Sequence, residues 1–111
     1  MTGLNSEILL RAYAAGLFPM AERHDEKKLY WIDPEKRGIL PLDKFHIPRR
    51  LRRTIRNKPF EIRCDTAFEK VIRNCAKPNK GRKETWINEQ IIMLYIDLSE
   101  LGRAHSVEAW L

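Results

Sequence analysis

The chain has 111 residues, of which 43% are hydrophobic and 32% are charged, so it can form one domain, or one domain and part of another. The mean hydropathy is -0.50 and no apolar run approaches the length of a membrane span, which excludes an integral membrane protein. Lys and Arg total 21 against 15 Asp and Glu, and the net charge of +6 favours a polyanionic partner such as RNA, DNA or an anionic membrane surface.

The first predicted element is an amphipathic helix near the start of the chain. Ser6 can cap this helix, and Gly16 can adopt the left-handed conformation that ends it. Its apolar positions recur with helical spacing and comprise Ile8, Leu9, Ala12 and Tyr13. Glu7 and Arg11 interrupt this pattern, which is not that of a secretion signal, so we expect a cytoplasmic location.

A short hairpin is predicted after the first helix. We expect "LFPM" to be a loop because Pro19 cannot continue the helix, and we expect the polar "AERHDEKK" to be a solvated turn. The apolar runs "LYWI" and "GILPL" lie on either side of "DPEKR", so a turn at Asp33 and Pro34 would pair them.

A second helix, beginning near Pro48, is unusually rich in arginine. Ile47, Leu51 and Ile55 recur every four residues and are expected to form one narrow buried stripe. The arginines project away from this stripe or lie at its flank; they are Arg49, Arg50, Arg52, Arg53 and Arg56. No acidic residue lies between positions 45 and 60, so phosphate binding is favoured over the alternative of a solvated helix face.

The second half of the chain begins with a predicted strand and helix. "FEIRCD" alternates apolar and polar residues, as in a strand with one wet face. "TAFE" is a capping box, with Thr66 as N-cap and Glu69 three residues later. The helix that follows is expected to bury Phe68, Val71, Ile72 and Cys75.

The basic loop, residues 77–84 with the sequence "KPNKGRKE", connects this helix to a longer one. Asn88 can cap the longer helix and Gly102 can end it; its apolar residues are Ile91, Leu94, Tyr95, Leu98 and Leu101. "AHSVEAWL" predicts a final strand. The fold class is therefore α+β, with an N-terminal α/β domain over residues 1–58 and a second domain over 59–111. Two strands leave the second domain an open-edged sheet, so we expect further strands to be lacking.

Two tryptophans stand outside the predicted apolar stripes. Trp31 lies in "LYWIDPEKR" among charges and a proline, and Trp86 lies in "KETWINEQ" between the basic loop and a helix start. Indoles beside basic residues can stack on unpaired bases, although each could instead fill the edge of the core. Trp110, inside a predicted strand, is expected to belong to the core.

A search for catalytic groups within the sequence is negative. It contains no Gly-rich phosphate loop, no HExxH motif and no nucleophile elbow. The three histidines show no metal-ligand spacing, and Cys64 and Cys75 are expected to be buried structural thiols. We therefore predict no catalytic residue, metal site or cofactor site in this chain.

Four ordered segments resemble the leucyl/phenylalanyl-tRNA–protein transferases: "AYAAGLFPM", "YWIDPEKRGILPLDKFHIPR", "TWINEQIIMLY" and "LGRAHSVEAW". The resemblance implies a monomeric cytoplasmic aminoacyltransferase without a cofactor. It would take Leu or Phe from aminoacyl-tRNA and attach it to proteins with N-terminal Arg or Lys, marking them for degradation. It also implies a small N-terminal domain followed by a GNAT-type acyltransferase domain.

The resemblance further assigns roles to the residues singled out above. Trp31 would line the site of the aminoacyl-adenosine, and Trp86 would pack on the terminal adenine. The arginines of residues 49–56 would meet the acceptor stem of the tRNA. Residues 59–111 would form the opening strand–helix–helix–strand part of the GNAT-type domain.

The chain departs from the family in its extent. Family members continue for about as many residues again, and that part holds the remaining strands, the Leu or Phe pocket and a "GESMF"-like segment with a catalytic acid. We therefore expect a truncated enzyme (a fragment, a frameshifted product or a wrongly assigned reading frame) with its catalytic residues downstream of Leu111 and no activity alone. A non-catalytic basic RNA-binding remnant and a marginally folded fragment are the alternatives.

Overall fold

The computed structural model describes residues 4–111, so residues 1–3 of the predicted N-terminal domain lie outside the described residues. The elements, in chain order, are α1 (Ser6–Ala14), β1 (Phe18–Met20), β2 (Tyr30–Ile32), the 3-10 helix η1 (Leu42–Lys44), α2 (Arg49–Asn57), β3 (Glu61–Cys64), α3 (Phe68–Ala76), α4 (Glu89–Glu100) and β4 (Val107–Trp110). This mixture of helices and small antiparallel sheets confirms the α+β class. Within the described part, no helix combines the length and the apolar content that crossing a bilayer requires.

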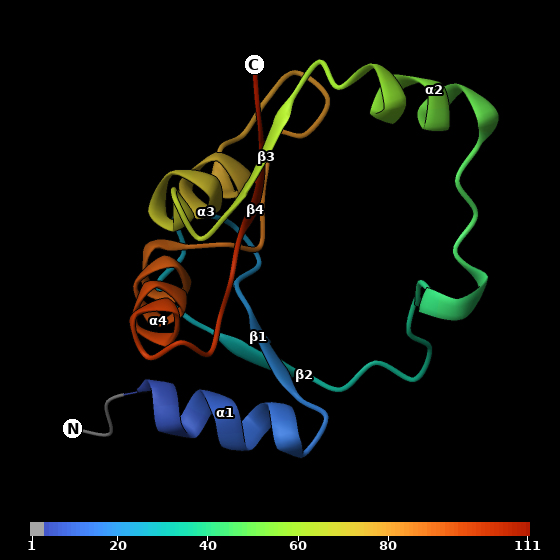
Figure 1. Ribbon diagram of the computed structural model, residues 1–111. Coiled ribbons are helices and arrows are strands. Elements are labelled where there is room, and N and C mark those ends of the chain that lie inside the picture. Colours follow the sequence, from blue (N-terminus) through green and yellow to red (C-terminus); the bar gives the residue numbers. More distant parts are fainter. Residues whose placement is uncertain (1–3) are drawn as a thin grey trace.

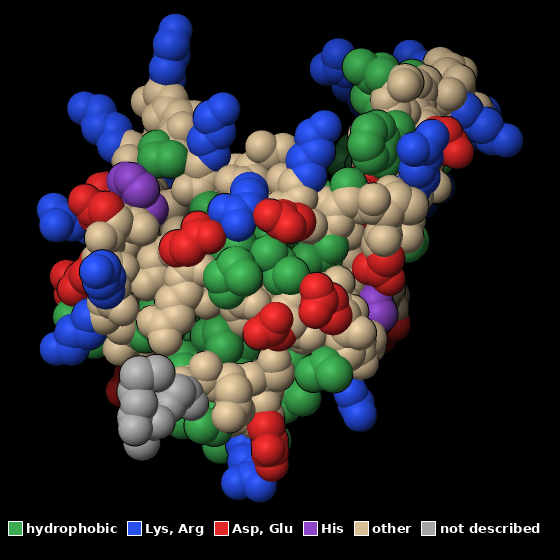
Figure 2. Space-filling view, turned by 90° about the vertical axis from the view of Figure 1, so that its left-hand side faces the viewer, with side chains coloured by type: hydrophobic (Ala, Val, Ile, Leu, Met, Phe, Trp, Pro, Cys, Tyr) green, Lys and Arg blue, Asp and Glu red, His purple; other side chains and the backbone are tan. Residues whose placement is uncertain are grey.

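The core lies where α4 packs against α1 on one side and α3 on the other (Figure 1). Leu9 of α1 meets Leu94 and Leu98 of α4 in one buried cluster. A second cluster lies toward α3 and comprises Ala76, Ile87, Ile91 and Ile92. Figure 2 shows the side of the molecule that carries α3 and α4, where hydrophobic side chains gather at the centre and charged ones surround them. Helix α4 therefore joins the two halves of the chain.

Strands β1 and β2 pair antiparallel, with Phe18 opposite Ile32 and Met20 opposite Tyr30. The predictions of a loop at "LFPM" and of a hairpin between "LYWI" and "GILPL" are therefore wrong. Pro19 is compatible with β1 because each strand of a two-stranded sheet is an edge strand, where a missing N–H is tolerated. The "GILPL" run forms no strand, and Leu42 is 93% exposed.

Residues 35–60, here called the arm, carry η1 and α2 (Figure 1). The arm contacts the rest of the molecule at Arg37, whose guanidinium donates to the Gly16 carbonyl, and beyond that contact it extends away from it. No residue of the arm is buried, and the apolar stripe predicted on α2 is exposed at Leu51 and Ile55. That prediction of burial is wrong because no other element among residues 4–111 packs against this side of α2. The radius of gyration of 16.5 Å exceeds the roughly 13 Å of a compact domain of this length because of the arm.

Strands β3 and β4 form a second antiparallel pair, with Arg63 opposite Glu108 and Cys64 opposite Val107. The predicted order of strand, helix, helix and strand is confirmed. The apolar face of this sheet, however, is open to solvent, with Ile62 63% and Val107 71% exposed. The expectation of buried thiols is wrong, because Cys64 and Cys75 are both exposed.

Two of the predicted N-caps are wrong. In one helix a different residue is the N-cap, and in the other the predicted N-cap residue is hydrogen-bonded elsewhere. In α1 the N-cap is Asn5 rather than Ser6, and its side-chain oxygen accepts a hydrogen bond from the Ile8 N–H at 3.0 Å. In α3 Thr66 is not the cap, because its backbone N–H and its hydroxyl both donate to the Glu108 carboxylate. Helix α3 consequently begins without a side-chain cap.

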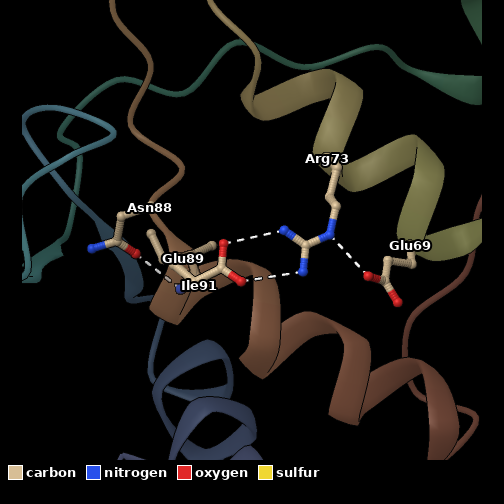
Figure 3. Close-up of polar contacts among 5 residues, drawn as sticks. All are labelled: Glu69, Arg73, Asn88, Glu89 and Ile91. Carbon is tan, nitrogen blue, oxygen red and sulfur yellow. Dashed lines mark hydrogen bonds and ion pairs between the residues drawn. The ribbon is translucent and has the colours of Figure 1, made fainter.

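The other predicted helix ends are confirmed. Asn88 caps α4 by accepting a hydrogen bond from the Ile91 N–H at 2.9 Å (Figure 3). Gly16 and Gly102 follow α1 and α4 with φ values of 86° and 74°. These left-handed conformations suit glycine, which has no Cβ to clash with the backbone.

Candidate functional site

The two tryptophans singled out from the sequence line one hollow on the surface. This tryptophan hollow has a volume of about 490 Å³ and is lined by Met20, Ala21, Glu22, Tyr30, Trp31, Ile32 and Trp86. Trp31 is 41% exposed and Trp86 is 38% exposed, so both indoles present part of their surface to solvent. The volume falls within the range of small-ligand sites.

The pairing of β1 with β2 supplies one wall of the hollow. Trp31 lies at the centre of β2, opposite Pro19 of β1, and Ala21 directly follows β1. The Ala21 N–H donates a hydrogen bond to the Trp86 carbonyl at 2.9 Å, which joins the end of β1 to the segment before α4. The residues on either side of Trp86 are buried, whereas Trp86 itself is exposed. The fold thus holds the Trp86 segment at its backbone and leaves the indole partly open.

Asn88 connects the segment that contains Trp86 to the loop of residues 21–29 by a hydrogen bond. It is only 3% exposed, and its amide nitrogen donates to the Glu26 carbonyl at 2.8 Å while its amide oxygen caps α4. The side chain of His24, in the same loop, pairs with Glu84 at 2.6 Å. Both contacts connect the β1–β2 region to residues immediately around Trp86.

Arg73 fixes the start of α4 from the side of α3. Its guanidinium donates two hydrogen bonds of 3.1 Å to Glu89 and one of 2.8 Å to Glu69 (Figure 3). Hydrogen bonds to Glu89, and then to Glu69, raise the pKa of Arg73, so this group stays charged. A planar guanidinium bound at two points to one carboxylate restricts the orientation of the α4 N-terminus.

The lining of the tryptophan hollow suits stacking rather than covalent chemistry. Aromatic and aliphatic side chains predominate, and Glu22 is the one ionisable carboxylate among the lining residues. The lining contains no Ser, Cys, His or Lys that could act as a nucleophile. A flat apolar ring with a polar edge, such as a nucleobase, is the kind of ligand that two indoles accommodate.

The arginines of α2 lie at a separate place. Four of them line a second hollow of about 490 Å³ on the arm, together with His46 and Ile47; they are Arg49, Arg52, Arg53 and Arg56. Arg50 is not among its lining residues, and the two hollows share none. The structure therefore brings Trp31 and Trp86 together but leaves the arginine cluster apart from them.

Sequence reasoning missed most of the hollow's wall, in particular Met20, Glu22 and Tyr30. The one usable signal was the apolar "LFPM" run, which has the composition of a short strand apart from its proline. Trp110, predicted to be core, is half-buried on β4, with Arg63 and Lys70 lying 4.9 and 5.6 Å from its ring centroid.

His24, Asp25 and Glu84 come close enough to offer three ligand atoms to a metal ion. All three are exposed, His24 already pairs with Glu84, and Asp25 lies 3.5 Å from Arg23. No sequence pattern indicates this group, because Glu84 lies far along the chain from His24 and Asp25. These contacts account for the cluster as surface ion pairs, and its carboxylates are not directed into the tryptophan hollow.

Comparison with known proteins gives consistent matches along the whole chain. The family model for leucyl/phenylalanyl-tRNA protein transferase matches residues 39–111, and the model for the N-terminal domain of that protein matches residues 3–35. A protein of Paramagnetospirillum magneticum named leucyl/phenylalanyl-tRNA–protein transferase is 61% identical over 110 residues. Proteins with the same name from Rhodospirillum rubrum and Nitrobacter winogradskyi are each 54% identical, over 110 and 107 residues.

The coverage of these matches is unequal. They include 99%, 99% and 96% of this chain but only 53%, 52% and 48% of the three relatives. The chain therefore spans about half the length of the curated relatives it matches.

Proposed function

Because the chain belongs to the leucyl/phenylalanyl-tRNA protein transferase family, we propose that it carries the site for the CCA end of an aminoacyl-tRNA. The reaction served by this site moves Leu or Phe from the tRNA to proteins with an N-terminal Arg or Lys, which are thereby marked for degradation. The enzyme acts as a monomer in the cytoplasm and needs no cofactor.

The observation that carries this proposal is the shared hollow of Trp31 and Trp86. The two residues are far apart in the sequence, and the β1–β2 pair and the Ala21–Trp86 hydrogen bond help to bring them to one place. In our proposal Trp31 contacts the aminoacyl-adenosine and Trp86 packs on the terminal adenine. Each base stack on an aromatic side chain contributes roughly 1–3 kcal/mol to binding.

The proposed reaction requires positioning more than activation, because the tRNA ester is already reactive. The α-amine of the acceptor protein attacks the aminoacyl carbonyl, an amide bond forms, the ester bond breaks, and the ribose oxygen leaves with a proton. Holding the adenosine fixed lowers the barrier by making the attack effectively intramolecular. The residues of this chain would contribute that fixing of the ester, through the hollow.

We further propose that the chain divides into an N-terminal domain over residues 1–58 and the start of a GNAT-type acyltransferase domain over 59–111. The β3–α3–α4–β4 order supports this assignment. In the same proposal the arginines of α2 bind phosphates of the acceptor stem; they are Arg49, Arg50, Arg52, Arg53 and Arg56. Their exposure and the lack of acidic neighbours in the arm's helix support this role.

Tryptophan variants test the proposal directly. Binding of an RNA minihelix ending in CCA is measured by polarisation of a label on its 5′ end. We expect Trp31→Ala and Trp86→Ala each to weaken binding by roughly 1–3 kcal/mol, about 5- to 150-fold. Trp110→Phe is the matched control, since that indole lies on β4 outside the hollow, and should bind as the unaltered chain does. Unchanged binding by both alanine variants would refute the assignment.

Binding without turnover is a second candidate function for this chain by itself. It is favoured by the lining of the hollow, in which Glu22 is the only ionisable carboxylate and no Ser, Cys, His or Lys is present. We expect the chain alone to bind the minihelix but to transfer no labelled leucine to a peptide that begins with Arg. Incorporation above a blank without protein would contradict this second candidate and leave the binding proposal intact.

The role of the arm is tested by the salt dependence of binding. Replacing Arg49, Arg52, Arg53 and Arg56 by Ala should flatten the plot of log affinity against log salt concentration. Counterions released from each neutralised phosphate set that slope, so fewer arginine contacts give a shallower one. An unchanged slope would exclude α2 as the contact.

A further inference from the structure

We infer that the lysines of the basic loop, residues 77–84, bind the backbone phosphates of the RNA strand whose terminal base enters the tryptophan hollow. This inference rests on the proposed function and assigns a second phosphate contact, separate from the arginines of the arm. The lysines concerned are Lys77, Lys80 and Lys83.

The basic loop has a defined shape. Asn79 and Arg82 exchange backbone hydrogen bonds of 2.7 and 3.2 Å, and the Asn79 side chain accepts one from the Gly81 N–H at 2.9 Å. The Arg82 guanidinium donates to the carbonyls of Cys75 and Lys77 at 2.8 and 2.9 Å, which ties the loop to the end of α3. Arg82 is therefore a structural residue, and the lysines project from a loop whose backbone is held by hydrogen bonds.

The three lysines carry charge that nothing nearby neutralises. All three are exposed, and within residues 4–111 none forms an ion pair with a carboxylate. The one acidic residue of the loop is Glu84, and its carboxylate pairs with His24 at 2.6 Å. Three unpaired ammonium groups on a short segment form a local positive potential that attracts a polyanion.

The loop leads directly to the hollow. Lys83 precedes Trp86 by three residues, and an extended chain covers at most roughly 3.6 Å per residue, so their Cα atoms lie within about 11 Å. In our inference, a strand that places its last base against Trp86 brings its preceding phosphates first to Lys83 and then to Lys80 and Lys77, which lie further along the loop. The arginines of α2 line a different hollow, and none of them lines the tryptophan hollow.

The neighbouring hollow also distinguishes a nucleic acid from an anionic membrane surface among the polyanions that the charge allows. A concave site of about 490 Å³ lined by two indoles fits a single flat ring, whereas a bilayer surface presents no such group. A single nucleic-acid strand offers both chemistries: a base for the indoles and phosphates for the lysines. A nucleic-acid strand is therefore the partner that the arrangement fits, and the proposed function specifies RNA.

The test compares two triple variants that each remove three positive charges. The first is Lys77→Ala, Lys80→Ala and Lys83→Ala in the basic loop. The control is Arg11→Ala, Lys70→Ala and Arg103→Ala, whose residues lie on α1, on α3 and after α4, outside the hollow. Each protein is titrated with a short single-stranded RNA ending in CCA, over a range of salt concentrations, and separately with adenosine, which has no phosphate.

We expect the loop variant to show a plot of log affinity against log salt that is shallower by about 2, because each single-strand phosphate contact contributes roughly 0.7. The control should keep the slope of the unaltered chain, and adenosine should bind all three proteins equally. Equal slopes for the two variants would overturn the inference, as would vesicle binding of phosphatidylglycerol that is lost in the loop variant while RNA binding is kept.

The same experiment separates this inference from the proposed function. If adenosine and the RNA bind the unaltered chain but the loop variant keeps its full salt slope, the tryptophan hollow stands and the lysines have no role. If neither adenosine nor the RNA binds the unaltered chain, the proposed function fails and this inference fails with it.

Discussion

Helices α2 and α4 have the same kind of apolar spacing, yet only α4 is buried. Ile91, Leu94 and Leu98 of α4 lie at helical spacing and are each less than 5% exposed. Leu51 and Ile55 of α2 are also separated by one helical turn, and both are exposed. The spacing of apolar residues predicts which side of a helix is apolar, but burial of that side needs a partner element.

The same difference in burial is found in the regions around the two helices. The body, which comprises α1, β1, β2, α3 and α4, contains both buried clusters. The arm contains no buried residue, and the adjoining β3–β4 sheet has an exposed apolar face. Stability should therefore be concentrated in the body, whereas changes in the arm should alter binding and leave the free energy of unfolding almost unchanged.

The largest expected effect comes from one substitution made in both helices. Leu94→Ala should lower the free energy of unfolding by about 2–5 kcal/mol, because it removes buried methyl groups and leaves a cavity between α1 and α4. Leu51→Ala, the matched change in the arm, should cost less than about 0.5 kcal/mol. Urea denaturation followed by circular dichroism measures both. Similar losses for the two variants would mean that α2 is packed in solution.

A smaller effect is expected at Asn88, which makes two separate contacts. Asn88→Ala should cost about 1–3 kcal/mol, since the α4 cap is lost and the Glu26 carbonyl loses its donor. Asn88→Ser retains an oxygen for the cap and loses the amide donor without adding a charge, so it should cost less. Denaturation curves of the two variants give the comparison. Equal losses would show that the cap contributes nothing measurable.

The pH dependence of stability should come from carboxylates that join β3 to β4. The His105 side chain, followed by the Ser106 N–H, lowers the pKa of Asp65, and the hydroxyls of Ser106 and Thr66 lower the pKa of Glu108. The unfolded chain titrates these groups near their ordinary values of about 3.9 and 4.3. Their stabilisation is therefore complete above those values and is lost as the pH falls through the lower pKa values of the folded state.

We accordingly expect the free energy of unfolding to fall as the pH is lowered from about 5 to about 2. The double variant Asp65→Asn and Glu108→Gln should be less stable at neutral pH and should show a weaker dependence in this acid range. Denaturation at a series of pH values tests the prediction. A double variant with an unchanged acid dependence would show that other carboxylates are responsible.

Local sequence patterns predict the positions of most helices, but they do not predict which strands pair in the two sheets. Asn88 and Gly102 delimit α4 through their own side-chain and backbone properties, so both could be predicted from the sequence. The β1–β2 pair joins segments on either side of a polar loop, and Pro19 gave a contrary signal. Thr66 is a residue type that commonly caps helices, but its hydroxyl donates a hydrogen bond to the carboxylate of Glu108, which is distant in the sequence.

The candidate site could likewise be predicted only in part. Trp31 and Trp86 can be predicted from the sequence because charged residues lie close to both, which is unusual for core indoles. Their meeting in one hollow depends on strand pairing and on the Ala21–Trp86 hydrogen bond, which no sequence pattern encodes. The binding roles of the two tryptophans and of the arginines in α2 stay predictions.

The smallest expected effect concerns proteolysis of the arm. Trypsin should cleave within α2, at residues 49–56, before it cleaves within α1, because cleavage in α2 needs only local opening of a helix with no buried residue. Leu94→Ala raises the unfolded population, so it should speed cleavage after Arg11 in α1 and leave the rate of the first cut within about twofold. Mass spectrometry of timed digests measures both rates. An equal acceleration of the two cuts would mean that α2 opens only together with the body, and the division between arm and body would then be wrong.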